Sequence, residues 1–352
     1  MTYDRPFLLY GATGYTGVLT ARMAVDLGMR PTLAGRSRDK VTRLAAELNL
    51  PWLAFGLDDG PAIRAALRDV PVVLNCAGPF SQTYRPVADA CLHTGTHYLD
   101  ITGEMFEHEE LAERDEEAQA ADVMLLPSAG FDVVPSDCLA LHVARRLPKA
   151  TRLALAFTSV GGWSRGTMTT SVEMVGRAGI VRREGRLTPV PAAYKSRKVD
   201  FGQGLTNVVT IPWGDLATAY HSTGIPNIET YIALSPTVER VLRRADAIAP
   251  LAASPLGQRV LKRLVGLMPE GPDAATRARG YALLWAEASD DAGNRVASRM
   301  RTPHAYTLTA VASLEIVRRV LAGDAPPGYQ TPAKAYGPDL VMEFGGVTRE
   351  DL

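Results

Sequence analysis

The sequence predicts an α/β fold in two parts, an N-terminal parallel sheet followed by a second α+β domain built on a mostly antiparallel sheet. Short apolar runs alternate with segments of helical periodicity through the first third of the chain, at the length of βαβ units. Three glycines directly follow the first apolar run. The alternation then changes after residue 148, which predicts a different second part.

The elements of the first part follow from the apolar runs and their stop signals. Gly28 ends the first predicted helix, and Ser37 stands at the N-cap of the second. Strand and helix alternate throughout, so the strands should be parallel. Strands are expected at 6–10, 30–34, 52–55, 70–75, 97–99 and 123–126, and helices at 15–27, 38–48, 62–67, 87–93 and 107–121.

The turn behind the first strand is the most informative feature. It contains Gly11, Gly14 and Gly17, so a buried strand breaks into three glycines and then a helix. The first glycine permits a tight turn, the second removes a Cβ that would block a phosphate, and the third lets helix and strand pack closely. This pattern predicts a Rossmann-type site for a nucleotide pyrophosphate at the helix N-terminus. The spacing is G-x-x-G-x-x-G, and an ordinary βα turn is the alternative.

The end of the second strand indicates which dinucleotide binds. An NAD site usually carries Asp or Glu there for the ribose 2′-hydroxyl, whereas an NADP site carries a cation for the 2′-phosphate. This chain has no carboxylate at that point and offers Arg36, with Arg38 close behind. A guanidinium can hold a phosphate through two parallel hydrogen bonds, so we expect NADP. A solvated loop arginine is the alternative.

Length, charge and cysteine content exclude several classes of protein. The 352 residues suffice for two domains, and 38 basic against 38 acidic residues give no global field for nucleic acid or an anionic membrane. Cys76, Cys91 and Cys138 are far apart in sequence and form no C-x-x-C pair. This argues against a disulfide framework or a zinc ribbon and suits a protein of the reducing cytosol. No leader precedes the first strand and no apolar stretch is long enough to span a membrane, so a cytoplasmic protein is expected.

Three further segments extend the pattern, each at the end of a predicted strand. They are residues 75–80 (NCAGPF), 98–104 (YLDITGE) and 129–137 (AGFDVVPSD). Together with the opening glycines, this series resembles the saccharopine dehydrogenase-like (saccharopine reductase-like) oxidoreductases. It is particularly similar to the bacterial branch that includes the trans-acting enoyl reductases. The resemblance covers residues 6–140 and is thinner afterwards, through 166–170, 218–226 and 336–339.

The resemblance implies a cofactor that lies along the carboxyl ends of the strands, where an open α/β sheet keeps its ligand crevice. Residues 134–137 are expected to start a helix, with nicotinamide contact by Phe131 or Asp132 as the alternative. The expected cofactor-binding residues are Gly11, Thr13, Gly14, Tyr15, Thr16, Arg36, Ser37, Asp58, Asn75, Cys76, Ala77, Gly78, Pro79 and Phe131.

A proton donor near the nicotinamide would serve the reduction of a carbonyl, an imine or an activated alkene. The candidate catalytic residues are Asp100, Tyr98 and His221, the last in a polar loop of the second domain; Glu104 and Tyr220 are further candidates. A satisfied structural role is the alternative, above all for His221.

Other chemistries find less support in the sequence. Cys76 has no adjacent histidine or lysine, so we expect a small core residue rather than a nucleophile. We expect neither a metal site nor a serine hydrolase. The Tyr-x-x-x-Lys spacing that short-chain reductases use on a helix starts here at Tyr194, outside that context.

The second part is expected to hold strands at 152–157, 199–201, 208–211 and 229–234, and helices at 167–178 and 307–321. We predict an NADP-binding domain at 1–135 and a substrate and dimerisation domain at 136–352, whose C-terminal segment can pack back on the first. A homo-oligomer is expected. Residues 238–268 form a basic amphipathic stretch, interpreted as solvated surface helices, a lid, or an element that lies on a membrane.

The sequence therefore predicts an NADP(H)-dependent oxidoreductase that transfers hydride to a C=C (enoyl), C=O or C=N bond of an apolar, lipid-like or medium-sized metabolite. Saccharopine reduction itself is less favoured, because the basic residues found near the expected pocket are few. A non-catalytic NADP(H) sensor or accessory protein is the alternative from another class. A membrane-surface accessory protein is a third.

Overall fold

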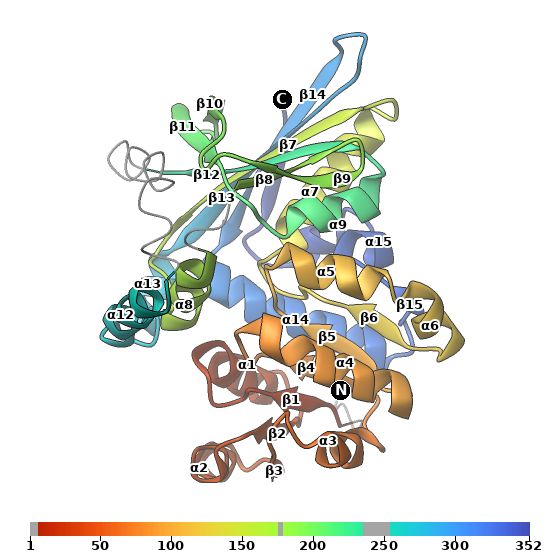
Figure 1. The fold of residues 1–352 in the computed structure, drawn as a ribbon, viewed down its shortest axis with the longest axis vertical. Helices are drawn as coiled ribbons and strands as arrows, with labels where there is room; N and C mark the ends of the chain where they lie inside the picture. Colours follow the sequence, from red (N-terminus) through yellow and green to blue (C-terminus); the bar gives the residue numbers. More distant parts are fainter. Residues whose placement is uncertain (1–5, 175–178, 235–253) are drawn as a thin grey trace. The chain divides into compact units, whose positions relative to one another are not determined.

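The computed structural model describes residues 6–174, 179–234 and 254–352 (Figure 1). The chain forms two compact units. Residues 1–134 and 306–335 make the first unit, and residues 135–305 and 336–352 make the second. The chain therefore returns to the first unit after completing most of the second.

The first unit is built on a seven-stranded sheet whose described strand pairs are all parallel. This confirms the predicted Rossmann-type sheet. Its last strand pairs with β6 but comes from the returning segment, which the local pattern did not reveal. In spatial order the strands are β15 (Gly328–Tyr329), β6 (Met124–Leu126), β5 (His97–Asp100), β4 (Val72–Asn75), β1 (Leu8–Tyr10), β2 (Thr32–Gly35) and β3 (Trp52–Ala54).

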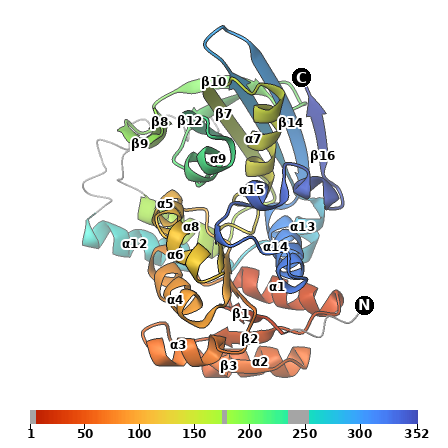
Figure 2. The ribbon, with the colours of Figure 1, turned by 90° about the vertical axis from the view of Figure 1, so that its right-hand side faces the viewer.

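Helices cover both faces of this sheet. Figure 2 shows α3 and α4 on one side and α1, α2 and α14 on the other. The helices are α1 (Tyr15–Asp26), α2 (Arg38–Leu48), α3 (Gly60–Leu67), α4 (Phe80–Thr94), α5 (Met105–Ala112), α6 (Asp115–Ala120), α14 (Ala305–Leu321) and α15 (Pro332–Tyr336).

One predicted helix is wrong. The expected helix over 107–121 is interrupted at Glu113 and Arg114, and α6 restarts at Asp115. Three consecutive acidic residues occupy the first turn of α6, where negative charge is favourable. Arg114 is held between Asp89, in an ion pair of 2.5 Å, and Glu117, at 2.8 Å.

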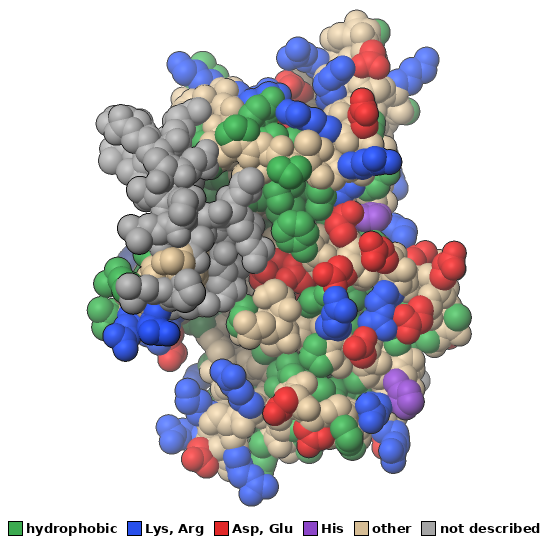
Figure 3. All heavy atoms as spheres, viewed as in Figure 1, with side chains coloured by type: hydrophobic (Ala, Val, Ile, Leu, Met, Phe, Trp, Pro, Cys, Tyr) green, Lys and Arg blue, Asp and Glu red, His purple; other side chains and the backbone are tan. Residues whose placement is uncertain are grey.

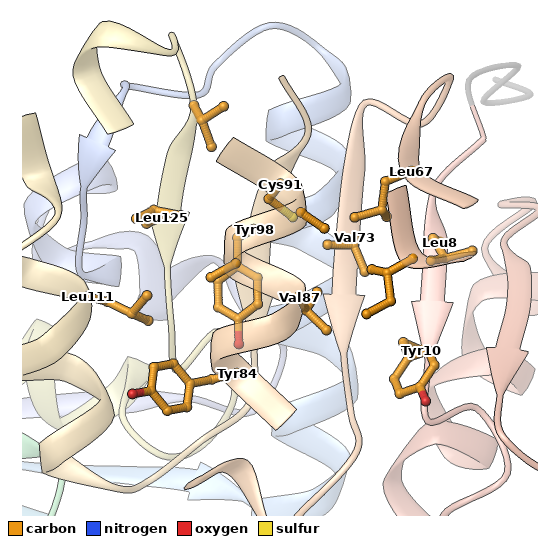
Figure 4. Close-up of a cluster of buried hydrophobic side chains, with 14 of the residues drawn as sticks. Leu8, Tyr10, Leu67, Val73, Tyr84, Val87, Cys91, Tyr98, Leu111 and Leu125 are labelled. Carbon is orange, nitrogen blue, oxygen red and sulfur yellow. The ribbon is translucent and has the colours of Figure 1, made fainter. Parts of the chain in front are cut away.

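The core of the first unit lies between the sheet and α3, α4 and α5. Figure 4 shows Leu8, Val73, Tyr98 and Leu125 from four strands packed against helical side chains such as Val87. The strands are in register, with Tyr10 beside Asn75 and Asn75 beside Asp100. The carboxyl ends of β1, β4 and β5 therefore lie in one row, which is where the predicted polar segments begin.

The second unit is built on a mostly antiparallel sheet, as predicted. Strands β12 and β7 are parallel, and the other described pairs are antiparallel. The main path runs β10 (Ser196–Asp200), β11 (Leu205–Thr210), β12 (Asn227–Ala233), β7 (Arg152–Val160), β13 (Tyr281–Ser289), β14 (Arg295–Pro303) and β16 (Thr348–Asp351), and β8 (Gly179–Arg183) joins β12 and β9 (Arg186–Val190).

The two faces of this second sheet differ. On one face Leu155 and Phe157 border a small cavity together with Leu139 of α7 (Val134–Arg146) and Asp215 of α9 (Asp215–Thr223). On the other face lie the apolar cluster around Trp285 and, farther along, charged side chains. The remaining elements are α8 (Arg165–Met174), α12 (Pro255–Gly266), α13 (Ala274–Arg279) and a 3₁₀ helix, η1 (Leu340–Glu343).

The basic stretch predicted at 238–268 is described only in part. Residues 238–253 lie outside the described residues. The remainder forms α12, where Ser254 caps the helix by accepting from the Gly257 amide at 3.1 Å, and Val260, Leu264 and Leu267 are exposed. In the described part of the chain, no helix has the length and apolar character needed to cross a bilayer. Figure 3 shows acidic and basic side chains interspersed on the face in view, as the neutral composition predicts.

Candidate cofactor site and the neighbouring strand ends

The glycine turn closes β1 tightly against β4. Gly11 has a φ of +76°, and a Cβ there would lie 2.6 Å from the backbone nitrogen of Ala77. A Cβ on Gly17 would lie 2.2 Å from the carbonyl oxygen of Gly11. Real side chains do not approach backbone so closely, so both positions require glycine for packing within the protein.

Gly14 differs from the other two glycines. It is exposed, has an ordinary φ of −78°, and a Cβ there would meet only the Gly11 oxygen, at 3.5 Å. Packing within the protein therefore does not require glycine at this position. A group approaching from outside would require it, which is the role predicted for the second glycine of a phosphate turn.

The N-terminus of α1 is also prepared for an anion. Gly14 is its N-cap and has no side chain to accept from the first-turn amides, and this first turn carries no acidic residue. The first-turn N–H groups and the positive end of the helix dipole therefore suit a negatively charged ligand. Thr13 lies next to β2, with its Oγ1 4.0 Å from the position of a Cβ on Gly35, and Tyr15 packs edge-on against Tyr306 at 5.1 Å.

The end of β2 brings the predicted selectivity residues to one place. Arg36 is exposed. Burial raises the pKa of the nearby Tyr10 hydroxyl; the charge of Arg36 lowers this pKa and the charge of Asp58 raises it. Tyr10 donates to the Phe55 carbonyl at 3.2 Å. Ser37 stands at the N-cap of α2 as expected, but its hydroxyl makes no capping hydrogen bond. These residues could hold a 2′-phosphate, and they fit NADP better than NAD.

The segment after β4 is held by its own side chains. Asn75 is fully buried; its Oδ1 accepts from the Ala77 amide at 3.0 Å and its Nδ2 donates to Thr83 at 3.3 Å. Asn75 therefore shapes the loop that carries Ala77, Gly78 and Pro79. Cys76 is buried, and burial raises the pKa of its thiol far above the ordinary value, as expected for a core residue rather than a nucleophile.

The ends of β5 and β6 are joined through Asp100, which is fully buried. Its Oδ2 accepts from Tyr98 Oη at 2.6 Å, and its Oδ1 accepts from the amides of Thr102 at 2.9 Å and Ser128 at 2.8 Å. Burial raises the pKa of Asp100 to about 6 despite these bonds. Tyr98 lies within the core (Figure 4), and the bond to Asp100 engages its hydroxyl.

A pair of carboxyl groups follows Asp100. Glu107, on the first turn of α5, is only 4% exposed, and burial, followed by the charge of Glu104, raises its pKa to about 9. Glu107 is therefore protonated at neutral pH. The Glu104 amide, in turn, donates to Thr102 Oγ1 at 3.2 Å.

Asp132, named in the sequence analysis only as an alternative nicotinamide contact, is a further candidate residue. It precedes α7, and its carboxyl packs over Gly103, where a Cβ would lie 3.1 Å from Asp132 Cβ and 3.3 Å from Oδ2. Among the described residues, no hydrogen bond or ion pair engages this carboxylate. Burial raises its pKa to about 7. The backbone beside it is fixed, because the Phe131 amide donates to Thr309 Oγ1 at 3.0 Å.

The sequence predicted that His221 lies in a polar loop, and this prediction is wrong. His221 is on α9, which ends at Gly224 in the left-handed conformation, and its ring packs against Tyr220 at 5.5 Å. The polar residues of this segment pointed to a loop because their local hydrogen-bonding capacity competes with helix formation. Ser222 and Thr223 satisfy theirs within the helix, by donating to the carbonyls of Thr218 and Ala219.

Two short patterns that the sequence analysis passed over have structural roles. Residues 162–166 read G-x-S-x-G, but Ser164 is buried and accepts from the Thr167 amide at 3.1 Å at the start of α8. His93 and His97 are four apart, but Gly95 ends α4 between them and His97 accepts from the Met124 amide at 3.0 Å. In the described part of the chain, no group of three or more His, Cys, Asp or Glu side chains could hold a metal ion.

The N-terminal domain matches a known family. Residues 7–126 match the model described as the saccharopine dehydrogenase NADP binding domain. A trans-acting enoyl reductase of Mycobacterium leprae (strain TN) is 33% identical over 148 residues, which are 40% of this chain and 35% of the relative. A saccharopine dehydrogenase-like oxidoreductase of Bos taurus is 27% identical over 187 residues, which are 47% of this chain and 44% of the relative. The matched region thus spans less than half of these curated relatives.

The whole chain also matches a solved structure. The apo, histidine-tagged saccharopine dehydrogenase (L-Glu forming) from Saccharomyces cerevisiae superposes with a TM-score of 0.69, covering 99% of this chain and 100% of that one at 11% identity. The likeness shows that the two chains share a fold.

Proposed function

We propose that this chain, whose N-terminal domain belongs to the saccharopine dehydrogenase NADP binding domain family, is an NADP(H)-dependent oxidoreductase. Its proposed reaction is hydride transfer to a C=C, C=O or C=N bond of an apolar or medium-sized metabolite. The observation that carries the proposal is the open glycine turn: the packing of the protein requires glycine at Gly11 and Gly17 but not at Gly14. The family match at residues 7–126 supports NADP as the ligand.

Within this class we favour an activated alkene as the substrate. Several curated relatives at 31–33% identity are named trans-acting enoyl reductases, among them those of Mycobacterium leprae and Mycobacterium ulcerans. The same names support a small-molecule substrate. The cytoplasmic location and the homo-oligomer expected from the sequence remain predictions.

The cofactor contacts are assigned by the elements that carry them. The α1 N-terminus, with Gly14, Tyr15 and Thr16, would hold the pyrophosphate, and Arg36 would hold the 2′-phosphate. The loop that Asn75 shapes would lie along the nicotinamide half. When bound, NADPH supplies the hydride.

Asp132 is our candidate for the proton that accompanies the hydride. Its carboxyl has no other partner among the described residues, and it lies over Gly103 at the strand ends where the crevice of such a sheet forms. Asp100 and Tyr98 would act as positioning residues, because their polar groups already bond within the protein. His221 remains a weaker candidate.

The test is to mix the protein with NADPH and a panel of enones, imines and ketones and to follow the absorbance of the reduced nicotinamide. We expect oxidation with at least one class, foremost the enones. Tight NADPH binding with no oxidation across the panel would instead support a non-catalytic sensor. The Asp132→Asn variant should bind NADPH like wild type and turn over slowly, and unchanged turnover would remove Asp132 from the proposal.

A further inference from the structure

A large basic groove lies entirely within the second unit, on the face of its sheet opposite α7 and α9. Its volume is about 1000 Å³. The floor comes from the beginning of β7 and β12 and the end of β13, and the wall comes from the β8–β9 hairpin and the start of β10. Its charged lining residues are Arg152, Arg182, Arg183, Glu184, Arg186, Lys195, Arg197, Glu229, Glu287 and Arg295.

The groove concentrates positive charge. Seven of these residues are basic and three are acidic, an excess of four, whereas the whole chain has 38 of each sign. Two of the three acids are already paired, Glu229 with Lys195 and Glu287 with Arg197 at 3.0 Å. Within the described residues, no carboxylate pairs with Arg183 or Arg186, which project from either side of the hairpin turn.

The hairpin that carries these two arginines is firmly anchored. Arg182 is only 2% exposed; it stacks on the Tyr220 ring at 4.3 Å and donates to the carbonyls of Leu216 and Gly185. The Gly185 amide donates to the Pro226 carbonyl at 2.9 Å. Anchoring the turn fixes the backbone from which Arg183 and Arg186 extend, so less conformational entropy is lost when they bind a ligand.

Aromatic rings also hold two of the arginines of the groove, Arg183, which has no carboxylate partner among the described residues, and Arg197, which pairs with Glu287. Arg183 lies over the Tyr194 ring at 5.3 Å and donates to its hydroxyl at 2.8 Å, and Arg197 lies over the Trp285 ring at 4.6 Å. A guanidinium stacked on a ring keeps N–H groups in its plane available, and these suit the oxygens of phosphate or carboxylate.

We propose that this groove binds a metabolite-sized polyanion, a small molecule with two or more phosphate or carboxylate groups. The volume matches the upper range of small-molecule sites, and cations converge on it from five strands. The lining is too polar and too positive for an apolar substrate, so this ligand is distinct from the reducible metabolite proposed above.

The experiment is calorimetric titration of the full chain with tripolyphosphate, in the presence of saturating NADPH so that the cofactor site is occupied. We expect one saturable site in wild type and a loss of affinity of at least about tenfold in the double variant Arg183→Gln, Arg186→Gln. Both side chains are exposed, so the variant should fold. Arg43→Gln, an exposed arginine of α2, is the matched control and should bind like wild type.

A parallel titration with citrate distinguishes phosphate from carboxylate ligands, and either result supports the site. The proposal is overturned if tripolyphosphate and citrate both give no saturable heat, or if the double variant binds as wild type does. It is also overturned if a poly-glutamate peptide binds through Arg183 and Arg186 while the small anions do not, because the groove would then be a docking surface for an acidic protein.

Discussion

Two stretches of the same sheet edge differ in how their polar groups are used. At the end of β1, the N-cap of α1 has no side-chain partner and the middle glycine leaves the turn open. At the ends of β5 and β6, polar groups bond to each other, as in the three hydrogen bonds that Asp100 accepts. The first stretch is suited to an anion from outside, and the second gathers carboxyl groups whose pKa values are raised by burial.

This contrast assigns different work to the two stretches. Unused donors at a helix N-terminus bind phosphate, whereas carboxyls with raised pKa values can hold a proton near neutral pH. Asp132 belongs to the second stretch but lacks the bonds that satisfy Asp100.

The largest effect is expected from Gly17→Ala. The added Cβ would lie 2.2 Å from the Gly11 oxygen, so the turn must move and NADPH binding should fall by at least about a hundredfold, with a lower unfolding temperature.

Gly14→Ala should separate binding from folding. We expect its stability to stay within about 1 kcal/mol of wild type and its NADPH affinity to be at least about tenfold weaker. Fluorescence titration and thermal melts measure both. Gly345→Ala, where nothing lies within 4 Å, is the control. Unimpaired binding by Gly14→Ala would contradict the open cradle.

Arg36→Gln should affect only one cofactor. We expect NADPH affinity to fall about tenfold or more, because a charge-assisted contact to the 2′-phosphate is lost, while NADH affinity stays within about twofold. The matched control is Arg38→Gln, since Arg38 lies over the Trp52 ring at 5.5 Å. An equal loss for both cofactors in Arg36→Gln would mean that the arginine supports the fold rather than the phosphate.

Asp132→Asn should change how stability depends on pH. The pKa of Asp132 is raised from 3.8 to about 7, so the folded wild type loses stability as pH rises from about 4 to about 7, while the unfolded chain is ionised and the folded protein still holds the proton. The variant cannot ionise there, so its stability relative to wild type should be higher at pH 8 than at pH 4. Urea unfolding at the two pH values measures this. The same difference at both would show an exposed, ordinary carboxyl.

The smallest effect is expected from Glu107→Gln. With a pKa of about 9, Glu107 already carries a proton in the folded protein at neutral pH, so the uncharged amide should leave the free energy of unfolding at pH 4 within about 1 kcal/mol of wild type and should not lower it at pH 7. Because the unfolded chain ionises this carboxyl from about pH 4.5, the wild type should lose stability between about pH 4.5 and 9 that the variant keeps, with no further difference above pH 9. A strong destabilisation at pH 7 would place a charged, bonded carboxylate at this position.

Local signals made the first stretch predictable. The strand, the glycine turn and α1 are contiguous, and Arg36 follows from counting onward to the end of the next strand. Helix α14 was likewise expected at 307–321 from its apolar period and is observed at Ala305–Leu321. Contacts distant in sequence were not visible: β15 has two residues, and only its pairing with β6 makes it a strand.

The environment of each carboxyl also depends on distant partners. The side chain of Asp132 fits beside Gly103, and Thr309 accepts a hydrogen bond from the neighbouring Phe131 amide. Both contacts come from residues distant in sequence, so the local pattern around residue 132 could not predict them. The sequence did not predict that Arg183 and Arg186 face each other across a hairpin turn and line one groove. The strands at Tyr281–Ser289 and Arg295–Pro303 were not expected, and the second of them carries three arginines.

The assignment of the site to NADP is tested by the dissociation constants of the wild-type protein for NADPH and NADH, measured under the same salt conditions. A site built from an open α1 N-terminus and Arg36 predicts NADPH binding at least about tenfold tighter than NADH. Equal affinities, or tighter binding of NADH, would contradict the assignment of the glycine turn and Arg36 to NADP.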